Sequence, residues 1–182
     1  DLDFDGKIDL AVANIFDDDV SVLFGNGDGT FQPQVRYAAG DQPRGLCILD
    51  ADGDGDSDIV TANRLSSDLS LLENRGDGSF EAQVRFQAGV SQETGVTACD
   101  MNRDGFTDLV VIGYSSGNAA VLLGNDNGTF APRGTRVLGS NPWMVVSGDL
   151  NGDGHVDIGA ALSGSNQAGI ARNDGTGGLL PP

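Results

Sequence analysis

The sequence has few basic residues. Lys and Arg together number 10 among 182 residues, against 27 Asp and Glu, which gives a formal net charge of −17. Binding to a nucleic-acid backbone requires clustered Lys and Arg that neutralise phosphates, so nucleic acid is excluded as a partner. No stretch approaches the roughly 18 consecutive apolar residues that a membrane span requires, so we expect no membrane insertion.

Histidine and cysteine are also scarce, and this restricts the chemistry. His155 is the single histidine, so neither a Ser-His-Asp triad nor a histidine-based zinc site can be assembled. Most carboxylates belong to a repeated motif, which leaves no separate acid and base pair, and we expect the chain not to be an enzyme. Cys47 and Cys99 form no close metal-ligand pair; they allow one disulfide between neighbouring units or two buried free thiols.

Long runs with helical periodicity and capping residues are absent as well. The apolar residues, 38% of the chain, fall in short β-rich runs that are bounded by Gly, Asp, Asn or Ser. Residues 46–49, 59–62, 69–72 and 84–86 are four such runs within one short segment. We predict that each is a strand and that the protein is all-β.

Two motifs recur in phase along the whole chain. An acidic nonapeptide reads DLDFDGKID, DADGDGDSD, DMNRDGFTD and DLNGDGHVD, and its copies start at residues 1, 50, 100 and 149. A glycine-rich motif ends 30 residues after each start, at Phe31, Phe80, Phe130 and Leu179. The chain is therefore a tandem array of four units, approximately residues 1–41, 42–91, 92–141 and 142–182.

The acidic nonapeptide has the composition of a calcium loop. Ca²⁺ takes six to eight oxygen ligands, and carboxylates at positions 1, 3 and 5 can surround it when Gly at position 6 permits a sharp turn. An EF-hand would need Glu at position 12, where this chain has Val12, Thr61, Val111 or Ala160. Carboxylates this close together would repel one another without a cation, so we predict one Ca²⁺ in each unit, about four in all.

The ligand set follows from these positions, with side chains at 1, 3, 5 and 9 and the main-chain carbonyl at 7. The expected ligands are Asp1, Asp3, Asp5, Lys7 and Asp9; Asp50, Asp52, Asp54, Asp56 and Asp58; Asp100, Asn102, Asp104, Phe106 and Asp108; Asp149, Asn151, Asp153, His155 and Asp157. Asn102 and Asn151 supply neutral amide oxygens, so their loops carry one negative charge less. Four Ca²⁺ ions would change the formal charge from −17 to −9, and binding would stabilise the folded state.

Together the two motifs resemble the FG-GAP/VCBS repeats of integrin α-subunit-like propellers, over essentially the whole chain. The resemblance implies a β-propeller of four-stranded antiparallel blades, with strands A to D, the calcium loop between A and B and the glycine-rich turn between C and D. The first unit would then lack strand A and the last would lack strand D, which leaves about fourteen strands. The chain is therefore interpreted as a single propeller domain or as a propeller fragment.

The same resemblance places the loops that vary between units on the face opposite the calcium loops. Arg44, Arg64, Tyr114 and Trp143 lie there and are the candidate ligand-binding residues. We expect a non-catalytic adhesion-type module that binds carbohydrate or an extracellular protein, secreted or at the cell surface because loops of this kind are loaded where calcium is millimolar. The alternatives are a structural subunit that self-associates through open blade edges, and the propeller part of a larger secreted enzyme or receptor.

Overall fold

The computed structural model describes residues 1–125 and 127–180, and these residues form an all-β structure. The strands are β1 (Leu10–Asn14), β2 (Asp19–Leu23), β3 (Val35–Ala38), β4 (Pro43–Leu49), β5 (Asp58–Asn63), β6 (Asp68–Leu72), β7 (Val84–Phe86), β8 (Glu93–Cys99), β9 (Asp108–Gly113), β10 (Asn118–Asn125), β11 (Thr129–Val137), β12 (Pro142–Gly148), β13 (Asp157–Leu162) and β14 (Gln167–Ala171). Within the described part of the chain, no helix is long and apolar enough to cross a membrane.

The described strands form four antiparallel sheets, one for each sequence unit. Their orders are β1-β2-β3, β4-β5-β6-β7, β8-β9-β10-β11 and β12-β13-β14, with sequential strands paired throughout. The predicted all-β propeller blades are confirmed, including a first sheet without strand A and a last sheet without strand D. The four strands predicted in the second unit all lie within β4 to β7.

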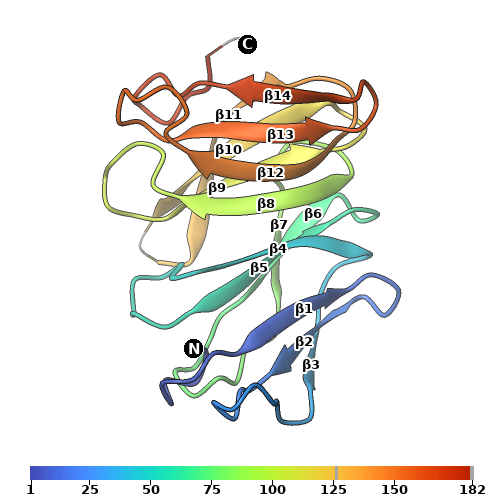
Figure 1. The fold of residues 1–182 in the computed structure, drawn as a ribbon, viewed down its shortest axis with the longest axis vertical. Coiled ribbons are helices and arrows are strands. Elements are labelled where there is room, and N and C mark those ends of the chain that lie inside the picture. Colours follow the sequence, from blue (N-terminus) through green and yellow to red (C-terminus); the bar gives the residue numbers. More distant parts are fainter. Residues whose placement is uncertain (126, 181–182) are drawn as a thin grey trace.

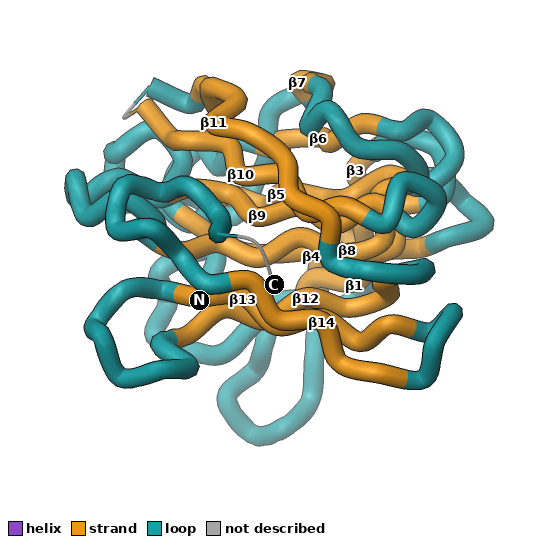
Figure 2. Tube along the Cα trace, turned by 90° about the horizontal axis from the view of Figure 1, so that it is seen from above, coloured by secondary structure: helices purple, strands orange, loops and turns teal. Residues whose placement is uncertain are grey.

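The sheets follow one another like the blades of a partial propeller (Figure 1). The A strands β4, β8 and β12 are the inner strands and contact one another in sequence, while β1 contacts β4. The view from above shows the strands at the centre and the connecting loops at the two ends of the sheets (Figure 2). The inner strands approach closely at Gly45, where an added Cβ would lie 2.8 Å from the Cα of Gly95.

Burial along the strands explains their sequence patterns. The middle sheets are covered on both faces, so β5 and β9 are buried at every residue, and β9 is apolar without interruption from Leu109 to Ile112. The sheet of β1 is covered on one face only, and Leu10 and Val12 remain 43% and 45% exposed. One apolar core therefore fills each of the three junctions between neighbouring sheets.

Candidate metal centres

The acidic loops join strand A to strand B. In each loop the residues at positions 4 and 6 have positive φ, which is the left-handed region of backbone conformation. Position 6 is Gly in every loop, with φ between 83° and 91°. Position 4 also has positive φ, and there Phe4 and Arg103 adopt values of 58° and 63° that glycine would adopt without strain. The sequence predicted the sharp turn at position 6, where every loop has Gly. It did not predict the positive φ at position 4, where the residue type varies.

In the first two units the loop carboxylates are brought close together. Asp1, Asp3 and Asp9 offer oxygens within 4.8 Å of one another, and Asp50, Asp52 and Asp54 do the same. Both clusters are acidic, oxygen-rich and partly exposed, which is the ligand chemistry that a hard divalent cation requires. These two triads could hold metal ions, and the residues present fit calcium.

The third and fourth units differ because position 3 is an amide. The Nδ2 atom of Asn102 donates to Asp104 at 2.7 Å, and that of Asn151 donates to Asp153 at 2.9 Å. The Oδ1 atoms accept from the main chain two residues later, as the Asp side chains do in the first two loops. These loops keep the turn but carry one negative charge less than the first two. Their ligand sets remain predictions.

Position 9 has a structural role that sequence reasoning missed. Asp58, Asp108 and Asp157 are at most 1% exposed, and each carboxylate accepts two main-chain N–H groups. In every unit one donor is the residue at position 2 of the loop and the other opens the glycine-rich turn, at Gly25, Asn74, Gly124 or Asn173. Burial raises the pKa of Asp58 to about 6, and it also raises that of Asp108. The equal spacing of the two motifs is the sequence signal of this connection.

The residue at position 7 makes one contact that all four loops share, and in the first unit it makes a second one. Its N–H donates to the carboxylate at position 5 in all four loops, at 2.8 to 2.9 Å. The ammonium of Lys7 also pairs with Asp5, which holds the pKa of that carboxyl below its ordinary value and places a cation beside the first cluster. The prediction that the carbonyls at position 7 are ligands stays a prediction.

The first three loops are also held by the unit that follows each of them. The Nδ2 atom of Asn74 donates to the carbonyl of Leu2 at 2.8 Å, and that of Asn173 donates to the carbonyl of Met101 at 2.7 Å. At the junction between them the N–H of Gly128 donates to the carbonyl of Ala51 at 3.1 Å. We call these three contacts the inter-unit braces. They connect the acidic loop of one unit to the glycine-rich turn of the next.

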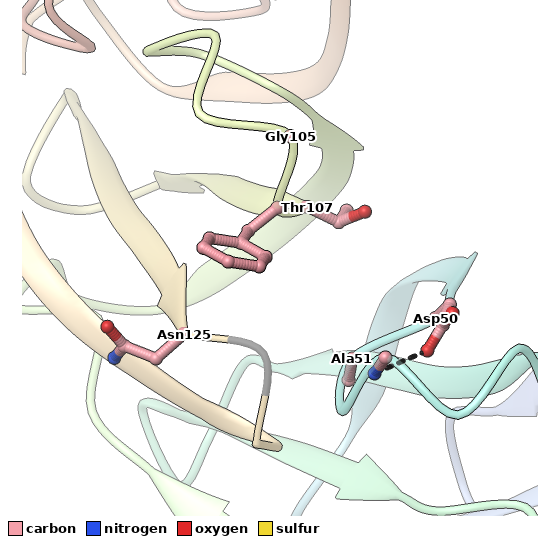
Figure 3. A pocket seen from close by; sticks show the side chains of 7 residues that line it. Asp50, Ala51, Gly105, Thr107 and Asn125 are labelled. Atoms are coloured by element: carbon pink, nitrogen blue, oxygen red, sulfur yellow. Dashed lines mark hydrogen bonds between the residues drawn. The ribbon is translucent and has the colours of Figure 1, made fainter.

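A polar hollow lies between the acidic loops of the second and third units (Figure 3). Asp50 and Ala51 line it from one side, and Gly105, Thr107 and Asn125 line it from the other. Neighbouring loops therefore open on a shared space at this end of the sheets.

The four predicted ligand-binding residues come together at the opposite end. Arg44 and Trp143 lie where strands A begin, and Arg64 and Tyr114 follow strands B. The guanidinium of Arg44 stacks on the Trp143 ring at 4.9 Å, and that of Arg64 lies 5.4 Å from the centre of the Tyr114 ring. The two rings meet edge to face with their centres 5.7 Å apart.

Both cysteines are free thiols, and they lie on the neighbouring inner strands β4 and β8. Burial raises the pKa of Cys47 to about 12 and that of Cys99 to about 11, so both stay protonated near neutral pH. Of the two alternatives left open by the sequence, the structure shows the free thiols.

Comparisons with known proteins agree with this architecture. The profile of the FG-GAP-like repeat matches three times, at residues 1–61, 50–111 and 100–160. No curated protein matches the chain. Among solved structures, a protein from Lactobacillus plantarum is 16% identical with a TM-score of 0.70, over 96% of this chain and 52% of that one.

Two further solved structures share the fold. The BBS1N chain from a complex with ARL6DN is 19% identical with a TM-score of 0.66, over 100% of this chain and 53% of that one. An Agrocybe aegerita lectin that recognises non-reducing terminal N-acetylglucosamine is 22% identical with a TM-score of 0.56, over 90% of this chain and 45% of that one. The chain thus spans about half the length of the solved chains that it matches. Its three profile matches and its blades show that it belongs to the FG-GAP-like repeat family.

Proposed function

We propose that the chain is a calcium-binding, non-catalytic module of an extracellular propeller, with one Ca²⁺ in each acidic loop. The observation that carries the proposal is the clustering of loop carboxylates within 4.8 Å in the first two units. In the second loop, burial first and then the charges of Asp54, Asp50 and Asp52 raise the pKa of the neighbouring Asp56, and a bound cation would offset the repulsion between these carboxylates. A divalent ion that binds only the folded loop would stabilise each unit.

The proposed location follows from the proposed ion. Surface loops of this kind bind calcium weakly enough to need the millimolar concentrations found outside cells. Secretion or display at the cell surface is therefore the compartment in which the four loops would be filled.

Absence of catalysis is proposed on the positions of the titratable groups. His155 lies in an acidic loop, and Glu93, whose pKa is raised to about 7, is completely buried between sheets. Neither group is placed to exchange protons with a substrate in an open cleft. We infer that the module binds carbohydrate or an extracellular protein through the face opposite the acidic loops.

Metal counting tests the proposal directly. By equilibrium dialysis against millimolar calcium, we expect the protein compartment to hold about four Ca²⁺ per chain in excess of the buffer, measured by mass spectrometry of the metal content, and a melting temperature that falls on chelation. The double variant Asp52→Asn/Asp54→Asn should lose one ion, because it keeps the oxygens that accept the N–H groups of Asp54 and Asp56 but removes two charges. Asp41→Asn, on an exposed loop, is the matched control and should keep all four. The proposal would be refuted if the chain bound no calcium and its melting temperature were the same with calcium and with chelator.

A second candidate is self-association through the outer sheets. The outward face of the last sheet exposes Met144, Val146 and Ile170 at 65%, 60% and 49%, and that of the first sheet exposes Leu10 and Val12. Uncovered apolar sheet faces are typical of interaction surfaces. Light scattering in calcium distinguishes the candidates, because a defined oligomer supports assembly and a monomer supports the binding module alone.

A further inference from the structure

Arg64, Tyr114, Trp143 and Arg44 form a continuous row, which we call the Arg–aromatic row. It joins the second, third and fourth units, because Arg64 lies over Tyr114, Tyr114 meets Trp143 edge to face, and Arg44 lies over the Trp143 ring. Next to it, Gly45, Thr94 and Val145 line a hollow between β4, β8 and β12 that also includes Arg44. The row therefore borders the opening between the inner strands.

The backbone places these side chains by means of local irregularities. The pairing of β4 with β5 skips Arg44, and that of β12 with β13 skips Trp143, so both residues occupy β-bulges. A bulge redirects a side chain out of the regular alternation of a strand. The sequence motifs contain no sign of these bulges.

Main-chain hydrogen bonds hold the other half of the row. The N–H of Arg64 donates to the carbonyl of Gln42 at 3.0 Å, and that of Tyr114 donates to the carbonyl of Gln92 at 2.9 Å. Each B–C loop is thereby tied to the connection that precedes its own sheet. The arrangement is fixed before any ligand arrives, which lowers the entropy cost of binding.

The charge of this row is not balanced within the described residues. Lys7, Arg36, Arg75 and Arg85 pair with carboxylates. Arg44 and Arg64 occur in no ion pair of the described chain, and the same is true of Arg103, Arg133, Arg136 and Arg172. Their Nε atoms are buried and have no hydrogen-bond partner among the described residues. Burial, and then repulsion from Arg64, lowers the pKa of Arg44, which indicates two neighbouring cations without a counter-ion. In a protein with a formal charge of −17, these two guanidinium groups form a local cationic site.

We propose that the Arg–aromatic row binds a sugar that carries an anionic oxygen group, either a uronate carboxylate or a sulfate ester. A guanidinium matches such a group with two parallel hydrogen bonds, and an adjacent aromatic ring offers an apolar surface to the C–H face of a sugar. Successive groups of the row are 4.9 to 5.7 Å apart, so two neighbouring groups are close enough to contact the same sugar unit. This inference rests on the proposed binding function and specifies its ligand class.

Matched sugars test the proposal by isothermal titration calorimetry at one fixed calcium concentration. Trigalacturonate is compared with its fully methyl-esterified form, and galactose 6-sulfate with galactose. We expect each anionic sugar to bind at least about tenfold more tightly than its neutral partner, because charge-assisted hydrogen bonds are lost in the neutral one. Preference for one anionic sugar identifies whether carboxylate or sulfate is the natural group.

Variants separate the row from the rest of the surface. Arg44→Gln and Arg64→Gln should each weaken binding of the preferred anionic sugar about tenfold. Arg75→Gln, which removes an exposed cation that pairs with Glu81, should leave binding unchanged. Calcium-dependent melting checks that all three variants fold.

Three results would overturn the inference: equal binding of charged and neutral sugars, no effect of either substitution in the row, or tighter binding of hexaglutamate than of both anionic sugars. The test is independent of the metal count. A chain without calcium that still distinguishes the sugars would refute the proposed metal function and keep the anionic-sugar site.

Discussion

The acidic loops of the third and fourth units share the same residues at positions 1, 3, 5, 6 and 9 and have different surroundings. At position 2, Met101 is 1% exposed beneath the glycine-rich turn of the next unit, whereas Leu150 is 52% exposed. The carbonyl of Met101 accepts a hydrogen bond from Asn173, and within the described residues no following turn reaches Leu150. The comparison teaches that a loop motif specifies its own turn, while the neighbouring unit determines how firmly that turn is held.

The largest effect is expected from the carboxylate at position 9, measured in chelator so that metal binding does not contribute. Asp108→Ala would leave the N–H groups of Met101 and Gly124 buried without acceptors, at a cost of about 4 kcal/mol. Asp157→Ala should cost about 2 kcal/mol, because the N–H of the exposed Leu150 can bond to water instead. Urea unfolding measures both values. An equal loss of unfolding free energy in both variants would contradict the idea that the neighbouring unit makes the third loop more sensitive than the fourth.

The next effect concerns Glu93, at the junction of the second and third units. Its side chain is completely buried, and both carboxylate oxygens lack a hydrogen-bond partner among the described residues. Burial, and to a smaller extent the charge of Asp68, raises its pKa from 4.5 to about 7. The folded state therefore keeps the proton longer than the unfolded state, so this group's contribution is complete below pH 4.5 and is lost as pH rises to 7.

The expected loss is on the order of 3 kcal/mol. Glu93→Gln cannot ionise, so it should be more stable than the parent chain above pH 7 and should show a flatter dependence of melting temperature between pH 5 and pH 8. Glu81→Gln, at an exposed carboxylate, is the control. Parallel pH profiles for the parent and Glu93→Gln would contradict the expectation.

A smaller effect tests the inter-unit brace itself. Asn74→Ala removes the donor to the carbonyls of Leu2 and Ser57 and should cost about 2 kcal/mol. Amide hydrogen exchange should also increase across residues 1–9, in a unit that does not contain the substitution. The control is Asn26→Ala, because the Asn26 side chain donates to Thr30 within its own turn. This substitution should leave amide exchange in residues 1–9 unchanged. Faster exchange confined to the second unit would show that the brace does not transmit order.

The smallest effect comes from position 4 of the acidic loops. Phe4→Gly and Arg103→Gly should each stabilise the protein by about 1 kcal/mol in thermal unfolding, because both residues have positive φ. Gly53→Ala, at the equivalent position of the second loop, should have the opposite sign. A destabilised Phe4→Gly would mean that the Phe side chain contributes more than the strain it causes.

Much of the architecture could be predicted from the sequence because the repeats carry it. The four in-phase copies of the motifs indicated four-stranded units, and the resemblance to known propellers implied the strand count and the shortened first and last sheets. The structure confirms all of these. The grouping of Arg44, Arg64, Tyr114 and Trp143 on one face was predicted from the resemblance to known propellers.

Other features could not be predicted, because they depend on contacts between strands or between units. The bulges at Arg44 and Trp143 are set by pairing across strands, and the burial of Asp108 is set by packing of a whole sheet against its neighbour. The stack of Arg44 on Trp143 joins residues that are two units apart. A motif within one unit contains no information about contacts between residues so far apart in the sequence.

The residue that opens the glycine-rich turn alternates along the chain: Gly25, Asn74, Gly124 and Asn173. A Cβ at Gly25 would lie 2.2 Å from the carbonyl oxygen of Ile8, and one at Gly124 would lie 2.1 Å from that of Thr107, so neither glycine can become Asn by itself. Equivalent residues therefore recur every 99 positions, from Gly25 to Gly124 and from Asn74 to Asn173. An exchange of single units would therefore bring together turns and loops that do not fit, whereas a shift by two units keeps the same residue type at this position.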